Sequence, residues 1–173
     1  MSQQVNETKQ IAAFLLKEID RLIDRPVRIM EVCGTHTVSI FRAGIRQLLP
    51  EKVELVSGPG CPVCVTPNDY LDTAIAYARQ EDVIITTFGD MLKVPGTSSS
   101  LNQVKAEGRD IRIIYSPMDS LQIAKDNPDK KVIFFAIGFE TTTPMSAVLI
   151  KEVVEQKINN LFFHINHVTV PEP

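Results

Sequence analysis

Short apolar segments typical of buried strands alternate with amphipathic helical segments along almost the whole chain. Strands are predicted at residues 27–32, 53–56, 83–88, 111–115, 131–137 and 161–168. Helices are predicted at residues 6–24, 35–49, 67–80, 101–107, 117–125 and 145–156. Because strands that are apolar throughout need cover on both faces, this alternation predicts an α/β fold. We expect a parallel sheet flanked by helices on both faces, a Rossmann-like three-layer arrangement.

A polar break at residues 126–129 (Asp-Asn-Pro-Asp) interrupts this pattern, which then restarts. The break predicts a first α/β domain at residues 1–127, with an N-terminal helix and the cysteine-containing loops. Residues 128–173 form a strand–helix–strand unit, which buries little apolar surface by itself. We therefore expect these residues either to begin a second, truncated α/β domain or to extend the first sheet.

Charge and composition exclude several classes of protein. The formal net charge of −3 gives no basic surface for nucleic acid. No apolar run approaches the roughly 20 residues of a membrane span, and the polar start lacks the pattern of a signal peptide. The chain has three cysteines, an odd number that does not suggest a disulfide framework. We expect a reducing, cytoplasmic setting.

The three cysteines lie in two loops that follow predicted strands. Cys61 and Cys64 are two residues apart in residues 58–64 (Gly-Pro-Gly-Cys-Pro-Val-Cys). Such a pair either cycles between dithiol and disulfide, binds a metal as thiolates, or is an inert turn. Cys33 precedes a helix whose N-terminus favours a thiolate, and His36 lies in the first turn of that helix. Zinc normally takes four ligands, and the three cysteines with His36 make up that number, so a mixed zinc site is also possible.

Further polar residues follow the other predicted strands. Asp90 lies in a loop after the third strand, with Lys93 close behind it. Glu140 begins a hydroxyl-rich loop that continues through Thr141 and Thr142. The alternatives here are a flexible loop around Asp90 and simple helix capping by the threonines. Because the carboxyl ends of parallel strands share one edge of a sheet, we expect the cysteines and both carboxylates on one rim.

His164 and His167 lie three residues apart in the last predicted strand. At that spacing their side chains point to opposite faces of a sheet, so a paired metal site is not expected. Packing roles are predicted for both histidines.

Six short segments, taken together and in this order, resemble the hydrogenase maturation factor HypD family. They are residues 33–37 (Cys-Gly-Thr-His-Thr), 58–64, 87–90 (Thr-Phe-Gly-Asp), 94–96 (Val-Pro-Gly), 115–119 (Tyr-Ser-Pro-Met-Asp) and 138–142 (Gly-Phe-Glu-Thr-Thr). The resemblance implies a scaffold that assembles the Fe(CN)₂CO centre of [NiFe]-hydrogenases, rather than a simple turnover enzyme. It implies HypC and HypE as partners, and a cleft between two α/β domains.

The resemblance also implies a role for each candidate residue. Cys33 is expected to hold the iron, with His36 in the same motif. Cys61 and Cys64 are expected to be the redox-active dithiol, and Glu140, with its threonines and Asp90, to act in the same cleft. Thr141 and Thr142 join His36 as expected cofactor-binding residues. Family members are about twice this length and carry a [4Fe–4S] cluster in a C-terminal part that is absent here. From the residues alone, a stand-alone thiol–disulfide oxidoreductase and a zinc-binding interaction module remain alternatives.

Overall fold

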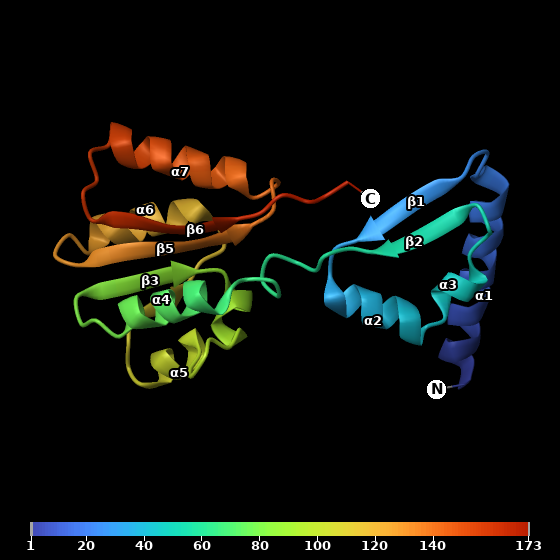
Figure 1. Ribbon diagram of the computed structural model, residues 1–173, viewed down its shortest axis with the longest axis horizontal. Helices are drawn as coiled ribbons and strands as arrows, with labels where there is room; N and C mark the ends of the chain where they lie inside the picture. The colour runs from blue at the N-terminus through green and yellow to red at the C-terminus, as the bar shows by residue number, and fades with distance from the viewer. Residues whose placement is uncertain (1, 173) are drawn as a thin grey trace. The chain divides into compact units, whose positions relative to one another are not determined.

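Within the part of the chain that the structure describes, the strands pair in parallel and form two sheets (Figure 1). The computed structural model describes residues 2–172. In the first sheet, β1 (Val27–Glu31) pairs with β2 (Val53–Ser57). The second has the order β4-β3-β5-β6, with bounds Ile111–Ile113, Val83–Thr87, Lys131–Gly138 and Leu161–His167. Helices flank these parallel sheets, which confirms the predicted α/β class.

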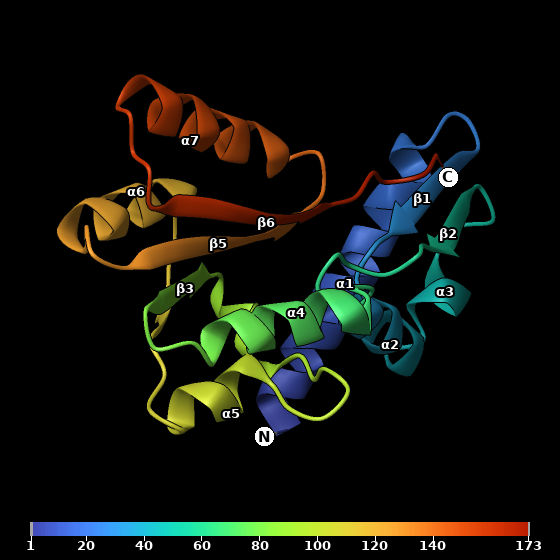
Figure 2. The same cartoon turned by 60° about the vertical axis from the view of Figure 1, so that its left-hand side comes forward.

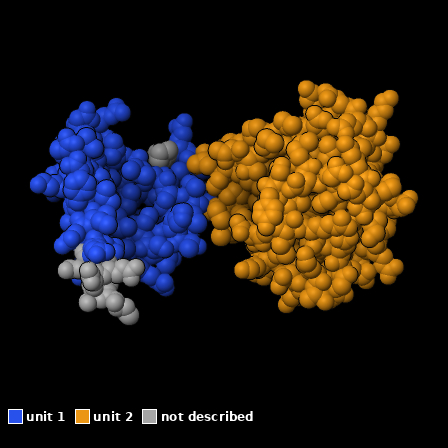
Figure 3. Space-filling view, turned by 180° about the vertical axis from the view of Figure 1, so that it is seen from behind, with its two compact units in different colours: residues 1–60, 171–173 blue, residues 61–170 orange. Residues whose placement is uncertain are grey.

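The chain divides into two compact units, coloured separately in Figure 3. Unit 1 is Met1–Gly60 with Pro171–Pro173, and unit 2 is Cys61–Val170. This division differs from the boundary predicted after residue 127. Strands β5 and β6 extend the sheet of β3 and β4, because β5 pairs with β3 along the five residues Val83 to Thr87. Of the two arrangements that the sequence left open for residues 128–173, the structure contains the extended sheet.

Unit 2 is a three-layer sandwich. Helices α4 (Asn68–Ala78) and α5 (Leu101–Ala106) cover one face of the sheet, and α6 (Pro117–Asp126) and α7 (Thr143–Glu155) cover the other (Figures 1 and 2). Every residue of β3 is buried, as is every residue of β5 after Lys131. These central strands are apolar throughout because both of their faces meet helices.

Neighbouring side chains of β5 belong to different cores. Phe135 packs with Leu71, Ile75 and other side chains on the α4 face. Phe134 packs with Leu121 and other side chains on the α6 and α7 face. Both phenylalanines are 0% exposed, as expected for alternating residues of a strand that is covered on both sides.

Local sequence signals account for several helix boundaries. Ser100 and Ser116 each start a helix with a capping box, in which side chain and backbone exchange hydrogen bonds. The single helix predicted at residues 35–49 is instead two, α2 (Gly34–Arg42) and α3 (Ile45–Leu48). Gly44 separates them with a φ of 64°, a left-handed conformation that ends the first helix. In the loop expected around Asp90 after β3, residues Gly89–Lys93 form a 3₁₀-helix, η1.

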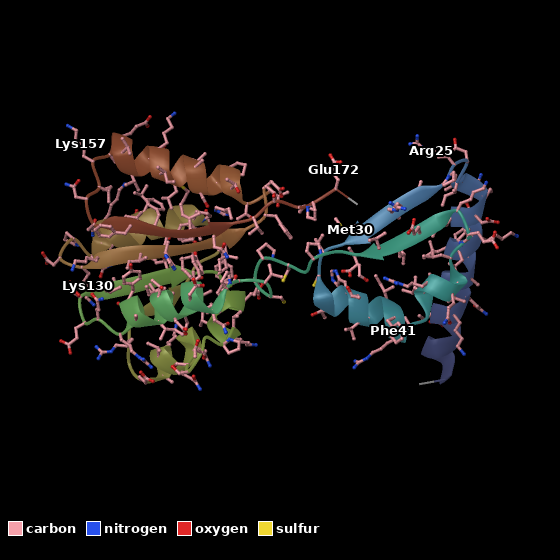
Figure 4. All side chains as sticks on the ribbon, in the orientation of Figure 1. Arg25, Met30, Phe41, Lys130, Lys157 and Glu172 are labelled. Atoms are coloured by element: carbon pink, nitrogen blue, oxygen red, sulfur yellow. The ribbon has the colours of Figure 1, made fainter. Side chains whose placement is uncertain are left out.

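Unit 1 is less well packed than unit 2. Its α1 (Ser2–Leu22), α2 and α3 border an apolar cavity of about 520 Å³ that both strands also line. No described side chain between residues 7 and 60 is fully buried. Phe41 projects from α2 with 78% of its surface exposed (Figure 4). None of the helices within residues 2–172 has the length and apolar character that crossing a membrane requires.

Asn160 is expected to be important for the stability of unit 2. Its side-chain amide donates to the carbonyl oxygens of Ala124, Asn127 and Lys130 at 2.9–3.0 Å, which ties the end of α6 to the start of β6. Asn160→Ala leaves these part-buried carbonyls without that donor, so we expect a loss of about 2 kcal/mol in the free energy of unfolding. Urea denaturation measures the loss. Asn160→Asp, which has the same shape but no donor, should be no more stable than the alanine variant, and a loss below about 0.5 kcal/mol in both would contradict this role.

Candidate functional site

The two cysteines of the Cys-x-x-Cys motif lie next to each other in a tight turn. Their sulfur atoms are 3.3 Å apart, with Cys61 as donor and Cys64 as acceptor, and no disulfide joins them. The Cys61 carbonyl oxygen accepts the backbone N–H groups of Cys64 and Val65 at 3.0 and 3.1 Å. A disulfide is about 2.05 Å long, so a shift of little more than 1 Å would join the two sulfurs.

Buried residues hold this turn in place. Pro62 and Thr66 are both buried, and the Thr66 hydroxyl donates to the Pro62 carbonyl oxygen at 2.6 Å. Val63 packs against the core beneath α4. Sequence reasoning did not single out Thr66, although a hydroxyl four residues after Pro62 is a recognisable signal for such a bond. The turn is therefore anchored through the Pro62 carbonyl and the buried Pro62 and Thr66 side chains.

A cavity of about 330 Å³ lies beside the turn in unit 2. Pro62 and Val63 form part of its wall, and the remainder comes from the loops after β3 and β5. Those loop residues are Phe88, Asp90, Met91, Ile137, Gly138, Phe139, Thr141 and Thr142. The structure thus brings predicted residues Asp90, Thr141 and Thr142 together around one cavity, next to the dithiol turn. The wall is mainly apolar, and Asp90 is its one carboxylate among the lining residues.

The loop after η1 is fixed by a carboxylate from α4. Asp72 accepts the Thr97 backbone N–H at 2.8 Å and the Thr97 hydroxyl at 2.6 Å. The hydroxyl first, and then the backbone N–H, lower the pKa of Asp72 below its usual value. The Asp72 carboxylate therefore stays charged, and keeps both hydrogen bonds from Thr97, until the pH falls to that lowered pKa. Asp72 thereby positions the Val-Pro-Gly segment at residues 94–96.

Glu140 is placed differently from its neighbours. It lines a second cavity of about 440 Å³ with Thr143, Pro144, His167, Val168 and Thr169. One of its carboxylate oxygens accepts the backbone N–H of Val170 at 2.6 Å. The sequence predicted Glu140 in one cleft with Asp90, but Glu140 does not line the cavity beside the dithiol. Residues 139–143 form a helix-like turn, in which consecutive side chains point in different directions.

Cys33 lies in unit 1, between the end of β1 and the start of α2. It is half-buried, and its backbone N–H donates to Glu31 at 2.9 Å. The other oxygen of that carboxylate is buried and has no hydrogen-bond partner within the described residues. Sequence reasoning missed Glu31, which precedes the motif by only two positions. His36 is exposed in the first turn of α2.

The last strand carries its two histidines on opposite faces, as predicted. His164 stacks on Tyr70 with ring centroids 3.9 Å apart, on the α4 face. Tyr70 in turn donates its hydroxyl to backbone carbonyls of β5 and β6, and burial raises the pKa of this phenol. His167 contacts the Ser146 hydroxyl of α7 at 3.0 Å. The first contact is ring stacking and the second is a hydrogen bond, and both join the strand to a helix.

Within residues 2–172, no three or more His, Cys, Asp or Glu side chains are grouped so as to hold a metal ion.

A family model described as the hydrogenase formation hypA family, HypD, matches residues 9–173. The chain belongs to the HypD family. The matched region contains the loops of all three cysteines, the Asp90 loop and the turn after Gly138.

Curated relatives agree with this assignment. The hydrogenase maturation factor HypD of Escherichia coli (strain K12) is 51% identical over 147 residues, which are 85% of this chain and 39% of that protein. That of Rhodobacter capsulatus is 48% identical over 170 residues, 94% of this chain and 45% of the relative. That of Azotobacter vinelandii is 49% identical over 164 residues, 94% and 43% respectively. The chain thus spans less than half the length of these HypD relatives.

Proposed function

We propose that the chain acts in hydrogenase maturation, as part of a scaffold on which the Fe(CN)₂CO centre of a [NiFe]-hydrogenase is assembled. The family match over residues 9–173 supports hydrogenase maturation. The observation that carries the redox part of the proposal is the pair of sulfurs 3.3 Å apart in an anchored turn. Iron is the cargo of such a scaffold rather than its resident cofactor.

Cys33 is the residue we propose as the iron ligand. A thiolate is a soft donor and suits a low-spin iron that carries cyanide and carbon monoxide. The three diatomic ligands occupy half of the six positions of an octahedral low-spin iron, and Cys33 is proposed to supply one of the remaining three. His36 is proposed to orient or protonate ligands at the same place.

The dithiol of Cys61 and Cys64 is proposed to supply or accept electrons during assembly. Oxidation of the pair forms one S–S bond and releases two electrons and two protons. Asp90, Thr141 and Thr142 line the adjacent cavity and offer a carboxylate and hydroxyls to a small polar ligand. Glu140 lines the neighbouring cavity, and its proposed part in the chemistry stays a prediction.

HypC and HypE are the proposed partners, and a reducing cytoplasm the proposed setting. A scaffold must leave its iron open to the proteins that deliver ligands and remove the product. Cys33, the proposed iron ligand, is only half-buried, so iron held there would stay within reach of other proteins.

A stand-alone oxidoreductase of the thioredoxin kind is the second candidate. In that fold the second cysteine of the pair lies within a helix. Here α4 begins at Asn68, four residues after Cys64. The family match and this local difference both favour the assembly scaffold.

Thiol counting tests the redox part of the proposal. After mild oxidation in air, Cys61 and Cys64 are expected to form a disulfide, because their sulfurs already lie 3.3 Å apart. Of the three thiols in the chain, two should then become measurable only after reduction. A Cys33→Ser variant is the control and should still gain two thiols on reduction. Three reactive thiols in the oxidised wild-type chain would contradict the redox role.

A further inference from the structure

The two cysteines of the dithiol turn are not equivalent. Cys64 is exposed, whereas Cys61 is half-buried. Pro62, which follows Cys61, is buried, and the Cys61 carbonyl oxygen is engaged by two backbone N–H groups. A disulfide on another molecule must approach the attacking sulfur in line, so access decides which thiol reacts with it.

The contact between the two sulfurs has a direction as well. The Cys61 thiol donates a hydrogen bond to Cys64 Sγ, with the two sulfur atoms 3.3 Å apart. The Cys61 thiol is therefore directed at Cys64, whereas Cys64 is the sulfur that a molecule from solvent can reach.

We propose that Cys64 is the cysteine that exchanges with an external disulfide, and that Cys61 is the resolving cysteine. This inference rests on the proposed redox role of the pair. Cys64, the second cysteine of the motif, then reacts with the molecule from solvent, and Cys61, the first and less exposed cysteine, reacts only with Cys64. The substrate class is a disulfide presented from solvent.

The exchange has two steps. In the first, the Cys64 thiolate attacks one sulfur of the external disulfide, forming a mixed disulfide and releasing the other sulfur as a thiolate. In the second, the Cys61 thiol loses its proton to solvent, and its thiolate attacks Cys64 Sγ. The second external thiolate leaves, and the Cys61–Cys64 bond forms. The external disulfide gains two electrons and the protein dithiol loses two. In reverse, an external thiolate attacks Cys64 Sγ.

The anchored turn favours the second step. Reacting atoms held about 3–3.5 Å apart are close to an attack geometry, and the two sulfurs are 3.3 Å apart before any reaction. The hydrogen bond from Thr66 to the Pro62 carbonyl keeps the segment between the cysteines in this conformation. A mixed disulfide on Cys64 is therefore expected to be short-lived while Cys61 is present.

Single-cysteine proteins test this assignment with Ellman's reagent, a symmetrical aromatic disulfide whose released thiolate absorbs visible light. In a Cys33→Ser background, Cys61→Ser keeps only Cys64 and Cys64→Ser keeps only Cys61. The protein that keeps Cys64 is expected to react about tenfold faster, and its mixed disulfide should persist in the mass spectrum. Equal rates, or faster reaction of the protein that keeps Cys61, would overturn the assignment. The corresponding alanine variants provide a second pair for the same comparison.

Two controls separate the possible failures. In concentrated urea the two single-cysteine proteins should react at the same rate, because the difference comes from the folded turn. A ratio that survives unfolding would contradict the structural explanation. The Cys33→Ser protein, with both turn cysteines, should release two equivalents of thiolate and retain no adduct. Release of one equivalent with a stable adduct would instead refute the redox role of the pair, whichever cysteine reacted first.

Discussion

Gly138→Ala is expected to destabilise unit 2 by about 3 kcal/mol and to disturb the cavity beside the dithiol. Gly138 is the last residue of β5 and is buried. A Cβ atom added there would lie 2.7 Å from Thr142 Oγ1 and 2.8 Å from Thr142 Cγ2, and closer still to Thr142 Cβ. Rotation of the Thr142 side chain does not move its Cβ, so the backbone of the turn must shift instead.

Urea denaturation of Gly138→Ala alone and in a Thr142→Gly background measures this effect. Thr142→Gly removes the three atoms nearest to the new methyl group, so the alanine should cost much less in that background. The two changes are therefore expected to be strongly non-additive, as for residues in direct contact. Equal costs in the two backgrounds would show that the glycine is required for another reason.

This prediction also concerns the candidate site. Gly138, Thr141 and Thr142 all line the cavity next to the dithiol turn. Thr142 donates its backbone N–H to Phe139 at 2.9 Å, which closes the turn after β5. The close approach of Thr142 to Gly138 thus shapes one wall of the cavity. The glycine in the Gly-Phe-Glu-Thr-Thr segment has a steric explanation that needs no ligand.

The sequence predicted the strands well because each carries its own signal. The run Val83–Thr87 is β-branched throughout, and the structure buries all of it. Sheet membership is different, because the pairing of β5 with β3 depends on cores that form across a long sequence separation. No local pattern distinguishes a strand that extends an existing sheet from one that begins a new domain. The division of the chain between Gly60 and Cys61 was therefore beyond local reasoning.

The candidate site was predictable to a similar extent. Placement after strands correctly brought Asp90, Thr141 and Thr142 to one cavity. The same reasoning placed Glu140 with them, because spacing from a strand does not determine the direction of a side chain within a turn. Residues that act through single hydrogen bonds, such as Thr66 and Asp72, were not predicted, since their partners are known only from the fold.

Cys33→Ala is expected to abolish iron retention while leaving the fold nearly unchanged. Cys33 is half-buried at a loop–helix junction and makes no side-chain cap to α2, so removal of its sulfur costs little packing. An anchoring thiolate has no substitute once it is removed, because a backbone or water ligand is a far weaker match for this iron. The loss should therefore be essentially complete.

Iron content after anaerobic loading measures the effect in this chain, and circular dichroism checks the fold. Hydrogenase maturation is measured in a chimera in which the chain replaces the matching part of the Escherichia coli relative.

Cys61→Ala and Cys64→Ala are the matched controls. They remove the same sulfur atom at other positions, and we expect them to impair maturation but to retain some iron. His36→Ala should fall between, because we propose that this side chain orients or protonates ligands at the iron without being an obligatory ligand. An external reductant should partly rescue the dithiol variants but never Cys33→Ala. If Cys33→Ala kept its full iron content and full maturation, the iron ligand would have to be another residue, and Cys33 would have a packing role only.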